Sequence, residues 1–312
     1  MAKEKYNIKL SVIVPVYNDQ EVLPELHKRL LNVLPEIADD YEIVLIDDGS
    51  ADNSWKIIEN LKNKDNRIVG IKLIRNFGQQ NAIAAGFDNI DGDVIVLMDS
   101  DLQDKPEDIP KLLEALYETE SSMAIAQWKS RQDKSLKIFV SRLFYWFSQK
   151  YTQISHQPRL GVFRAIQRST IDELRKYQEK TSTTLSLLYY VGVDYVPVEL
   201  ERDPRFAGKS GYNLKKMLKL TIDRVFSFSM MPIRMAIFTG LIISGISFLA
   251  GIALIIRYFL GVVASGWTSS IVLILFLFGV NFLFLGIIGE YLGRIFLESK
   301  NRPKYVIKKT LK

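Results

Sequence analysis

Residues 93–104 constrain the fold more than any other part of this sequence. Residues 93–98 are mostly apolar, are rich in valine and isoleucine, and directly follow Gly92. A short run of this kind is typical of a strand buried on both faces of a parallel sheet. In open α/β sheets, ligands bind beyond the carboxyl ends of the strands. We therefore expect a binding site at the polar residues that follow, Asp99-Ser100-Asp101-Leu102-Gln103-Asp104.

The spacing of these polar residues indicates a metal ion. In an extended chain, side chains two residues apart point the same way, so Asp99 and Asp101 share one side and Gln103 is next in step. Hard oxygen ligands of this type suit Mg²⁺ or Mn²⁺, which can also carry phosphate oxygens. Asp104 has a different interpretation, because an aspartate two residues before Pro106 is an ordinary helix start signal.

Three earlier segments repeat the pattern of an apolar strand, a polar loop and a helix. The strands are expected at residues 9–14, 41–46 and 68–74, and the helices from about residue 21 and at 55–61 and 81–87. Four such units predict right-handed crossovers and a doubly wound, mainly parallel α/β sheet. No Gly-x-Gly-x-x-Gly follows any of these strands, which argues against a dinucleotide-dependent dehydrogenase.

Composition excludes several kinds of chemistry. The chain has no cysteine and only two histidines, so disulfides, thiolate catalysis and a histidine-built metal site are not expected. The formal charge of +6 could indicate nucleic acid as a partner. The basic residues, however, gather at the ends of long apolar runs, which is the pattern of a membrane protein. We therefore expect no nucleic-acid partner.

Two apolar runs near the carboxyl end predict transmembrane helices. Residues 235–256 carry no charge, and residues 271–288 contain one strongly polar residue, Asn281. Residues 134–151 and 214–231 are basic and amphipathic, as in helices that lie in a membrane interface. Basic residues precede the first run and follow the second, and residues 261–270 between them are uncharged. Both ends of the chain should therefore be cytoplasmic.

The polar loops also identify a family. The chain resembles glycosyltransferase family 2, and within it the polyisoprenyl-phosphate glycosyltransferases, such as the bactoprenol glucosyltransferases and dolichol-phosphate mannose synthases. The resemblance covers nearly the whole chain and rests on four motifs in the same order, Val14-Pro15-Val16-Tyr17-Asn18-Asp19, Asp47-Asp48-Gly49-Ser50, Arg75-Asn76-Phe77-Gly78 and Asp99-Ser100-Asp101-Leu102-Gln103-Asp104.

The resemblance implies a GT-A-like catalytic domain and roles for individual residues. Asp101 and Gln103, with Asp99, would hold Mg²⁺ or Mn²⁺ on the diphosphate of a nucleotide sugar. Asp99, Asp101 and Arg131 would be the catalytic residues. The nucleotide sugar would be bound by Pro15, Tyr17, Asp19, Asp48, Gly49, Arg75, Gly78 and Asp99.

A phosphate acceptor sets its own requirements. A phosphate monoester is mostly dianionic at pH 7, because its second pKa is about 6, so no strong general base is needed. Cationic and hydroxyl groups are needed to hold it, and the candidates are Arg131, Arg164, Arg202, Arg205, Lys209 and Ser210. The sequence departs from the family at Arg159 and Val162, where related proteins often carry acidic residues.

We therefore predict a GT-A-like catalytic domain at 1–210, a juxtamembrane amphipathic helix at 211–232, a two-helix transmembrane region at 233–297 and a basic cytoplasmic tail at 298–312. The expected reaction transfers glucose from UDP-glucose to undecaprenyl phosphate at the inner membrane. Transfer of another sugar, from GDP-mannose or a UDP-aminoarabinose derivative, stays open. So does a non-catalytic, nucleotide-binding membrane adaptor. Residues 304–308 alternate like an edge strand that could pair with another subunit, so we expect a homo-oligomer.

Overall fold

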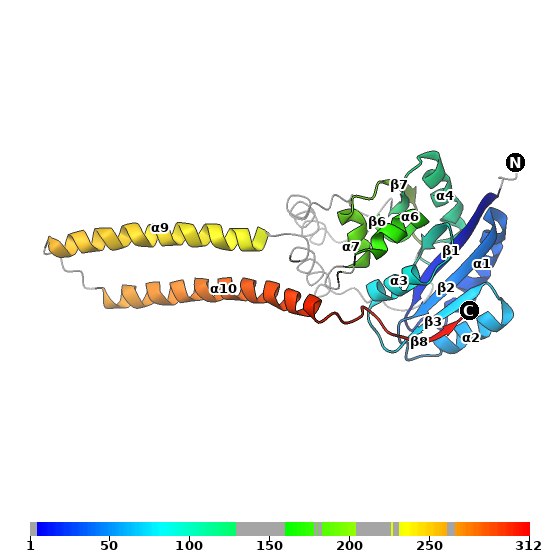
Figure 1. Ribbon diagram of the computed structural model, residues 1–312, viewed down its shortest axis with the longest axis horizontal. Coiled ribbons are helices and arrows are strands. Elements are labelled where there is room, and N and C mark those ends of the chain that lie inside the picture. The colour runs from blue at the N-terminus through cyan, green and yellow to red at the C-terminus, as the bar shows by residue number, and fades with distance from the viewer. Residues whose placement is uncertain are drawn as a thin grey trace. The chain divides into compact units, whose positions relative to one another are not determined.

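The computed structural model describes residues 5–128, 160–177, 179, 183–203, 226, 231–260 and 266–312. The chain forms two compact units, Met1–Asn213 together with Pro303–Lys312, and Leu214–Arg302. The first unit contains a sheet with helices on its faces, and the second contains two long helices (Figure 1). Most of the basic amphipathic segments at 134–151 and 211–232 lie outside the described residues.

The sheet of the first unit is mixed, and the described residues contribute eight strands to it, in the order β7-β5-β6-β4-β1-β2-β3-β8. The neighbours β4, β1, β2 and β3 run parallel, as do β5 and β7, whereas β6 and β8 run antiparallel to the strands they pair with. The strands are β1 Tyr6–Val16, β2 Ala38–Asp47, β3 Ile68–Leu73, β4 Val94–Leu97, β5 Met123–Trp128, β6 Leu160–Gln167, β7 Tyr195–Leu200 and β8 Ile307–Leu311. The expected doubly wound, mainly parallel sheet thus forms one half of the observed sheet, and β6, β5 and β7 extend it on the far side of β4.

Helices follow the parallel strands, as the repeated units predict. In the first unit they are α1 Leu23–Ile37, α2 Ser54–Lys64, α3 Gln79–Asp88, the 3₁₀ helix η1 Pro106–Asp108, α4 Ile109–Glu118, α6 Arg168–Arg175 and α7 Thr184–Tyr190. The buried residues of α1 recur every three or four positions, so a single stripe faces the sheet. They are Leu23, Leu26, Leu30, Leu34 and Ile37.

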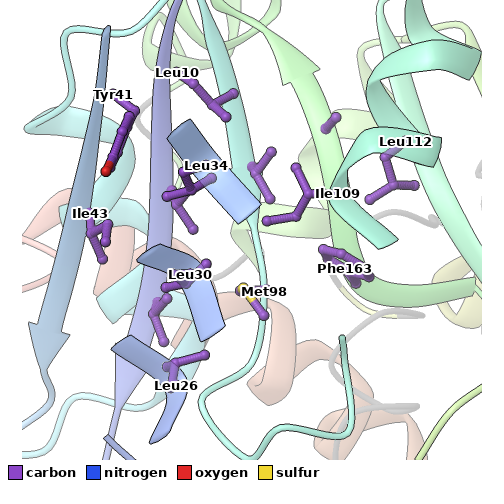
Figure 2. Packing of buried hydrophobic residues seen from close by; sticks show 14 of the residues in the cluster. Leu10, Leu26, Leu30, Leu34, Tyr41, Ile43, Met98, Ile109, Leu112 and Phe163 are labelled. Atoms are coloured by element: carbon purple, nitrogen blue, oxygen red, sulfur yellow. The ribbon is translucent and has the colours of Figure 1, made fainter. Parts of the chain in front are cut away.

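The main hydrophobic core lies between the sheet and the helices α1, α2 and α4. Figure 2 shows the part of it that α1 and α4 cover. Alternate residues of β1, including Leu10 and Val12, point into this layer, and Met98 and Phe163 extend it toward α4. Helix α3 covers the opposite face. It approaches the sheet closely, because a Cβ on Gly86 would lie 2.7 Å from Cγ2 of Ile13. Packing on both faces fixes β1, β2 and β4, whose ends carry the polar motifs.

The carboxyl-terminal tail belongs to the first unit. Its strand β8 is one of the two edge strands, and it pairs antiparallel with β3 of the same chain, with Leu311 opposite Gly70 (Figure 1). Tyr305 donates a hydrogen bond of 2.6 Å to Asp88 at the end of α3, and Lys309 lies 2.8 Å from Glu59 of α2. The division that set 298–312 apart as a separate tail therefore differs from the structure, since Pro303–Lys312 completes the sheet.

In the described part of the second unit, the secondary structure is that of two long helices, α9, Met231–Phe259, and α10, Trp267–Ser299. Both helices are long and apolar enough to cross a membrane, over Met231–Arg257 and Ser270–Ser299, and neither span is buried inside the structure. Their exposed residues include Phe248, Leu249 and Phe282, each more than 60% exposed. Apolar surface of this extent requires an apolar environment. Both predicted runs, 235–256 and 271–288, lie within these helices.

Candidate active site

Three loops meet at the carboxyl edge of the sheet because β1, β2 and β4 are adjacent and parallel. Val16 pairs with Asp47, and the N–H of Asp48 donates to the carbonyl of Val16 at 2.9 Å. On the other side of β1, the N–H of Met98 donates to the carbonyl of Ile13 at 3.1 Å. The polar residues after the three strands therefore lie at one edge, as the sequence predicts.

The loop after β1 is tied to the loop after β2 by hydrogen bonds in both directions. The N–H of Asn18 donates to Oγ of Ser50 at 3.0 Å, and Oδ1 of Asn18 accepts from the N–H of Ala51 at 2.8 Å. Asn18 has a φ of 57°, a left-handed conformation that asparagine tolerates. This arrangement leaves Tyr17 49% exposed at the sheet edge, one residue beyond the end of β1, which contains Pro15.

Asp19 connects the loop after β1 to the loop after β4. Its Oδ2 accepts hydrogen bonds from Oγ of Ser100 at 2.6 Å and from the N–H of Tyr17 at 3.2 Å. Burial raises the pKa of Asp19, while these two hydrogen bonds act in the opposite direction. Sequence reasoning did not assign a role to Ser100, although it stands between the two metal candidates.

Asp48 and Gly49 shape the turn after β3. The carboxylate of Asp48 accepts the N–H of Phe77 at 2.7 Å and that of Gly78 at 2.9 Å. Burial raises the pKa of Asp48, against the effect of these hydrogen bonds. Gly49 has a φ of +68°, and a Cβ there would lie 2.4 Å from the carbonyl carbon of Arg75. The two residues thus hold the 75–78 backbone directly against the end of β2.

The predicted metal ligands lie in the loop after β4. Oδ1 of Asp99 accepts a hydrogen bond of 2.7 Å from Nε2 of Gln79, the first residue of α3. Oδ1 of Asp101 accepts the N–H of Gln103 at 3.2 Å. The side-chain amide of Gln103 donates to the carbonyl of Asp203 at 3.1 Å. Gln79 was not among the predicted site residues, although it directly follows the Arg75–Gly78 motif.

Asp104 does not cap a helix, contrary to the sequence interpretation. The residue preceding η1 is Lys105, and it makes no side-chain capping bond. Asp104 is instead buried, and its Oδ2 accepts the N–H of Asp99 at 3.3 Å. Its Oδ1 lies 3.6 Å from Nε of Arg202. Burial, followed by the charge of Asp99, raises the pKa of Asp104 to about 7, while the Arg202 guanidinium opposes the rise.

The donor set fits a hard divalent cation that also binds phosphate. Among the described residues, no group of three or more His, Cys, Asp or Glu side chains is placed to hold a metal ion. Mg²⁺ in a nucleotide site needs only one or two carboxylates, because phosphate oxygens and water complete its coordination. Asp99 and Asp101, whose charges both act on Asp104, supply two carboxylates of this kind.

The predicted acceptor residues separate into three groups. Arg202 joins the carboxylate cluster, with a terminal nitrogen 3.6 Å from Oδ2 of Asp99 and its guanidinium 5.2 Å from the ring centroid of Trp128. Arg164 is 3% exposed on β6 and donates to the carbonyls of Val162 and Gly161. The remaining candidates, Arg131, Arg205, Lys209 and Ser210, lie outside the described residues.

The fold is that of the GT-A-like glycosyltransferases. A mannosyltransferase from Pyrobaculum calidifontis, solved in complex with GDP-mannose and Mn²⁺, superposes with a TM-score of 0.50 at 16% identity, over 71% of this chain and 64% of that one. Residues 11–175 match the family described as Glycosyl transferase family 2. The chain belongs to this family and is a glycosyltransferase, which confirms the predicted fold class and the resemblance.

Two curated relatives are similar along nearly their whole lengths. The prophage-derived bactoprenol glucosyl transferase of Shigella flexneri is 36% identical over 97% of this chain and 98% of that protein. The undecaprenyl-phosphate 4-deoxy-4-formamido-L-arabinose transferase of Proteus mirabilis is 34% identical over 99% of this chain and 95% of that protein. The similarity therefore includes the two apolar helices as well as the catalytic unit.

Proposed function

We propose that this protein transfers a hexose, with glucose from UDP-glucose as the first candidate, to a polyprenyl phosphate such as undecaprenyl phosphate. One observation carries the proposal. The Asp99 and Asp101 carboxylates stand at the carboxyl edge of a GT-A-like sheet, in a chain whose α9 and α10 expose apolar surface over membrane-spanning lengths. The names of the Shigella and Proteus relatives, which both refer to a polyprenyl carrier, support the lipid acceptor.

The donor is bound by the three loops at the sheet edge. Pro15, Tyr17, Asp19, Asp48 and Gly49 surround the base and ribose, and Arg75 and Gly78 complete this side of the site. Asp99, Asp101 and Gln103 hold Mg²⁺ or Mn²⁺ near the diphosphate. When bound, the ion neutralises the negative charge that develops on the departing nucleoside diphosphate.

The transfer is a single displacement. An oxygen of the acceptor phosphate attacks the anomeric carbon of the sugar as the bond from that carbon to the diphosphate oxygen breaks. The electron pair of the broken bond leaves with the nucleoside diphosphate, and the configuration at carbon inverts. The acceptor phosphate is already dianionic, so the protein needs cations to orient it rather than a carboxylate base. Arg131, Arg202, Arg205, Lys209 and Ser210 are the proposed acceptor-binding residues. Arg164 is not retained among them, because it is buried and its guanidinium donates to the carbonyls of Val162 and Gly161.

The two helices anchor the enzyme in the inner membrane. Residues 300–312 contain six lysines and arginines and no acidic residue, and residues 261–270 between the two apolar runs are uncharged, which favours a cytoplasmic location for the catalytic domain and both termini. The active site then has access to soluble nucleotide sugar on the same side as the lipid phosphate. We retain a homo-oligomer as a proposal, because β8 lies at one edge of the sheet and its outer side could pair with a strand of another subunit.

The test uses purified full-length protein, undecaprenyl phosphate, and Mg²⁺ or Mn²⁺ with a panel of radiolabelled UDP- and GDP-sugars. Label that partitions into organic solvent is the readout. We expect metal-dependent labelling from UDP-glucose. Labelling only by a UDP-aminoarabinose derivative, as the Proteus relative's name would favour, or only by GDP-mannose, would replace the sugar but keep the reaction. Nucleotide binding without labelling from any donor would favour the membrane adaptor.

A further inference from the structure

The loop that carries the proposed metal ligands is folded back on itself by Asp104. Oδ2 of this buried side chain accepts the N–H of Asp99, five residues earlier, at 3.3 Å. Between them, Leu102 adopts a left-handed conformation, with a φ of 58°, and its side chain is buried. A leucine pays a steric cost in this conformation and holds it only when its surroundings fix the turn.

A second segment, residues 202–203, is hydrogen-bonded to the same loop. The N–H of Asp203 donates to the carbonyl of Gln103 at 3.2 Å, and Nε2 of Gln103 donates back to the carbonyl of Asp203 at 3.1 Å. Lys105 Nζ lies 2.7 Å from the Asp203 carboxylate. These contacts bring the neighbouring residue, Arg202, to the loop, where Trp128 lies under its guanidinium.

Arg202 connects two carboxylates of the loop. Its Nε lies 3.6 Å from Oδ1 of Asp104, and a terminal nitrogen lies 3.6 Å from Oδ2 of Asp99. Within the described part of the chain, Oδ1 of Asp104 has no hydrogen-bond partner. A buried carboxylate with an unsatisfied oxygen is unfavourable for folding by itself, so its presence calls for an explanation. The contacts of its two oxygens provide this explanation. Oδ2 accepts the N–H of Asp99, and Oδ1 faces Arg202, which in turn faces the Asp99 carboxylate.

We propose that Asp104 is a positioning residue for the metal site, acting through Asp99. It fixes the backbone of Asp99 directly and holds Arg202, which faces the Asp99 carboxylate, in place. Nε2 of Gln79 donates to the other oxygen of the same carboxylate, Oδ1, at 2.7 Å. The inference rests on the proposed function, because it assumes that Asp99 and Asp101 bind a metal–nucleotide complex.

The test measures binding rather than turnover. Full-length protein is titrated with Mn²⁺ at saturating UDP, with bound Mn²⁺ followed by electron paramagnetic resonance, and with UDP alone by calorimetry. The variant Asp104→Asn keeps an acceptor for the Asp99 N–H but removes the charge that faces Arg202. Outer contacts of this type change metal affinity by about 10–100-fold. We expect a rise of that size in the Kd for Mn²⁺, with the affinity for metal-free UDP unchanged.

Asp108→Asn is the matched control, because Asp108 is also a buried acid of the same region but pairs with Lys111, 2.7 Å away. It should bind Mn²⁺ as the wild type does. If Asp104→Asn shows no cooperative unfolding transition, Arg202→Gln replaces it, and the same weakening of Mn²⁺ binding is expected.

Wild-type Mn²⁺ affinity in a folded Asp104→Asn or Arg202→Gln variant would overturn the positioning role alone. An equal loss of affinity for metal-free UDP would overturn it too, since it would indicate a general structural defect. Absence of UDP-dependent Mn²⁺ binding in the wild type would overturn the proposed function together with this inference.

Discussion

Gly49 provides a test of how the nucleotide side of the site is built. The residue combines a φ of +68° with close contact to neighbouring backbone, since a Cβ would lie 2.4 Å from the carbonyl carbon of Arg75 and 2.6 Å from the nitrogen of Asn76. Alanine at this position therefore meets two separate costs. The left-handed conformation costs about 1–2 kcal/mol for a residue with a Cβ. Relieving the overlap requires a backbone shift, which costs about 1–3 kcal/mol in a packed region.

Gly192 is a matched control for the first cost. It has a φ of +79°, but a Cβ there would meet nothing within 4 Å. Gly192→Ala should therefore lower the free energy of unfolding only by the cost of the left-handed conformation, about 1–2 kcal/mol. Gly49→Ala should be less stable than this control by about 2 kcal/mol, which corresponds to a melting temperature roughly 4–8 °C lower for a unit of this size.

The assay is thermal unfolding of the full-length variants in detergent, followed by circular dichroism, with UDP affinity measured alongside. Gly49→Ala should also weaken UDP binding, because the 75–78 turn that Asp48 holds must move away from the end of β2. Equal melting temperatures for the two variants would refute the close contact between Gly49 and the turn. Unchanged UDP affinity in Gly49→Ala would refute the assignment of that turn to the nucleotide.

Two further predictions concern the stability of the catalytic unit. Truncation after Arg302 removes β8 and uncovers the edge of β3, so we expect a lower melting temperature and aggregation in size-exclusion chromatography, and an unchanged monodisperse profile would contradict the assigned pairing. Burial tends to raise the pKa of Asp65, but hydrogen bonds from Arg67 outweigh it and lower the pKa overall. Because the folded-state pKa lies below the unfolded-state pKa of about 3.9, the ionised carboxylate stabilises the fold at pH values above 3.9. This stabilisation is lost as the pH falls through the folded-state pKa. Between about pH 5 and 2, the free energy of unfolding measured with a chemical denaturant should therefore fall more steeply for wild type than for Asp65→Asn. Parallel pH dependences of the two proteins would contradict the effect.

The parallel half of the sheet could be predicted because its signals are local. Buried parallel strands appear as short apolar runs, and the carboxyl ends of adjacent strands must lie at one edge. This geometry alone brings Asp48, Asp99 and Asp101 together, although they are far apart in the sequence. The Arg75–Gly78 turn follows from the same reasoning, because β3 lies beside β2.

Other features depend on contacts that no local pattern encodes. An aspartate two residues before a proline, such as Asp104, is typical of a helix cap, but the left-handed turn at Leu102 brings the Asp104 carboxylate back to the N–H of Asp99 instead. Alternation predicted a strand at 304–308, and the structure places it at Ile307–Leu311. Its pairing with β3 could not be predicted, because it joins positions as distant as Gly70 and Leu311. Arg164 was predicted from the sequence to hold the acceptor phosphate, but the pairing of β6 with β4 and β5 buries it.

The most direct test of the account is sugar transfer by wild type and Asp101→Asn, side by side. Initial rates are measured with saturating nucleotide sugar, undecaprenyl phosphate and Mn²⁺, with Asp39→Asn, an exposed acid paired with Lys5, as the control. A bound metal contributes several kcal/mol to transition-state stabilisation, and each 1.36 kcal/mol is tenfold in rate, so Asp101→Asn should be at least about 100-fold slower while Asp39→Asn matches wild type. Equal rates of lipid labelling by wild type and Asp101→Asn would contradict the account.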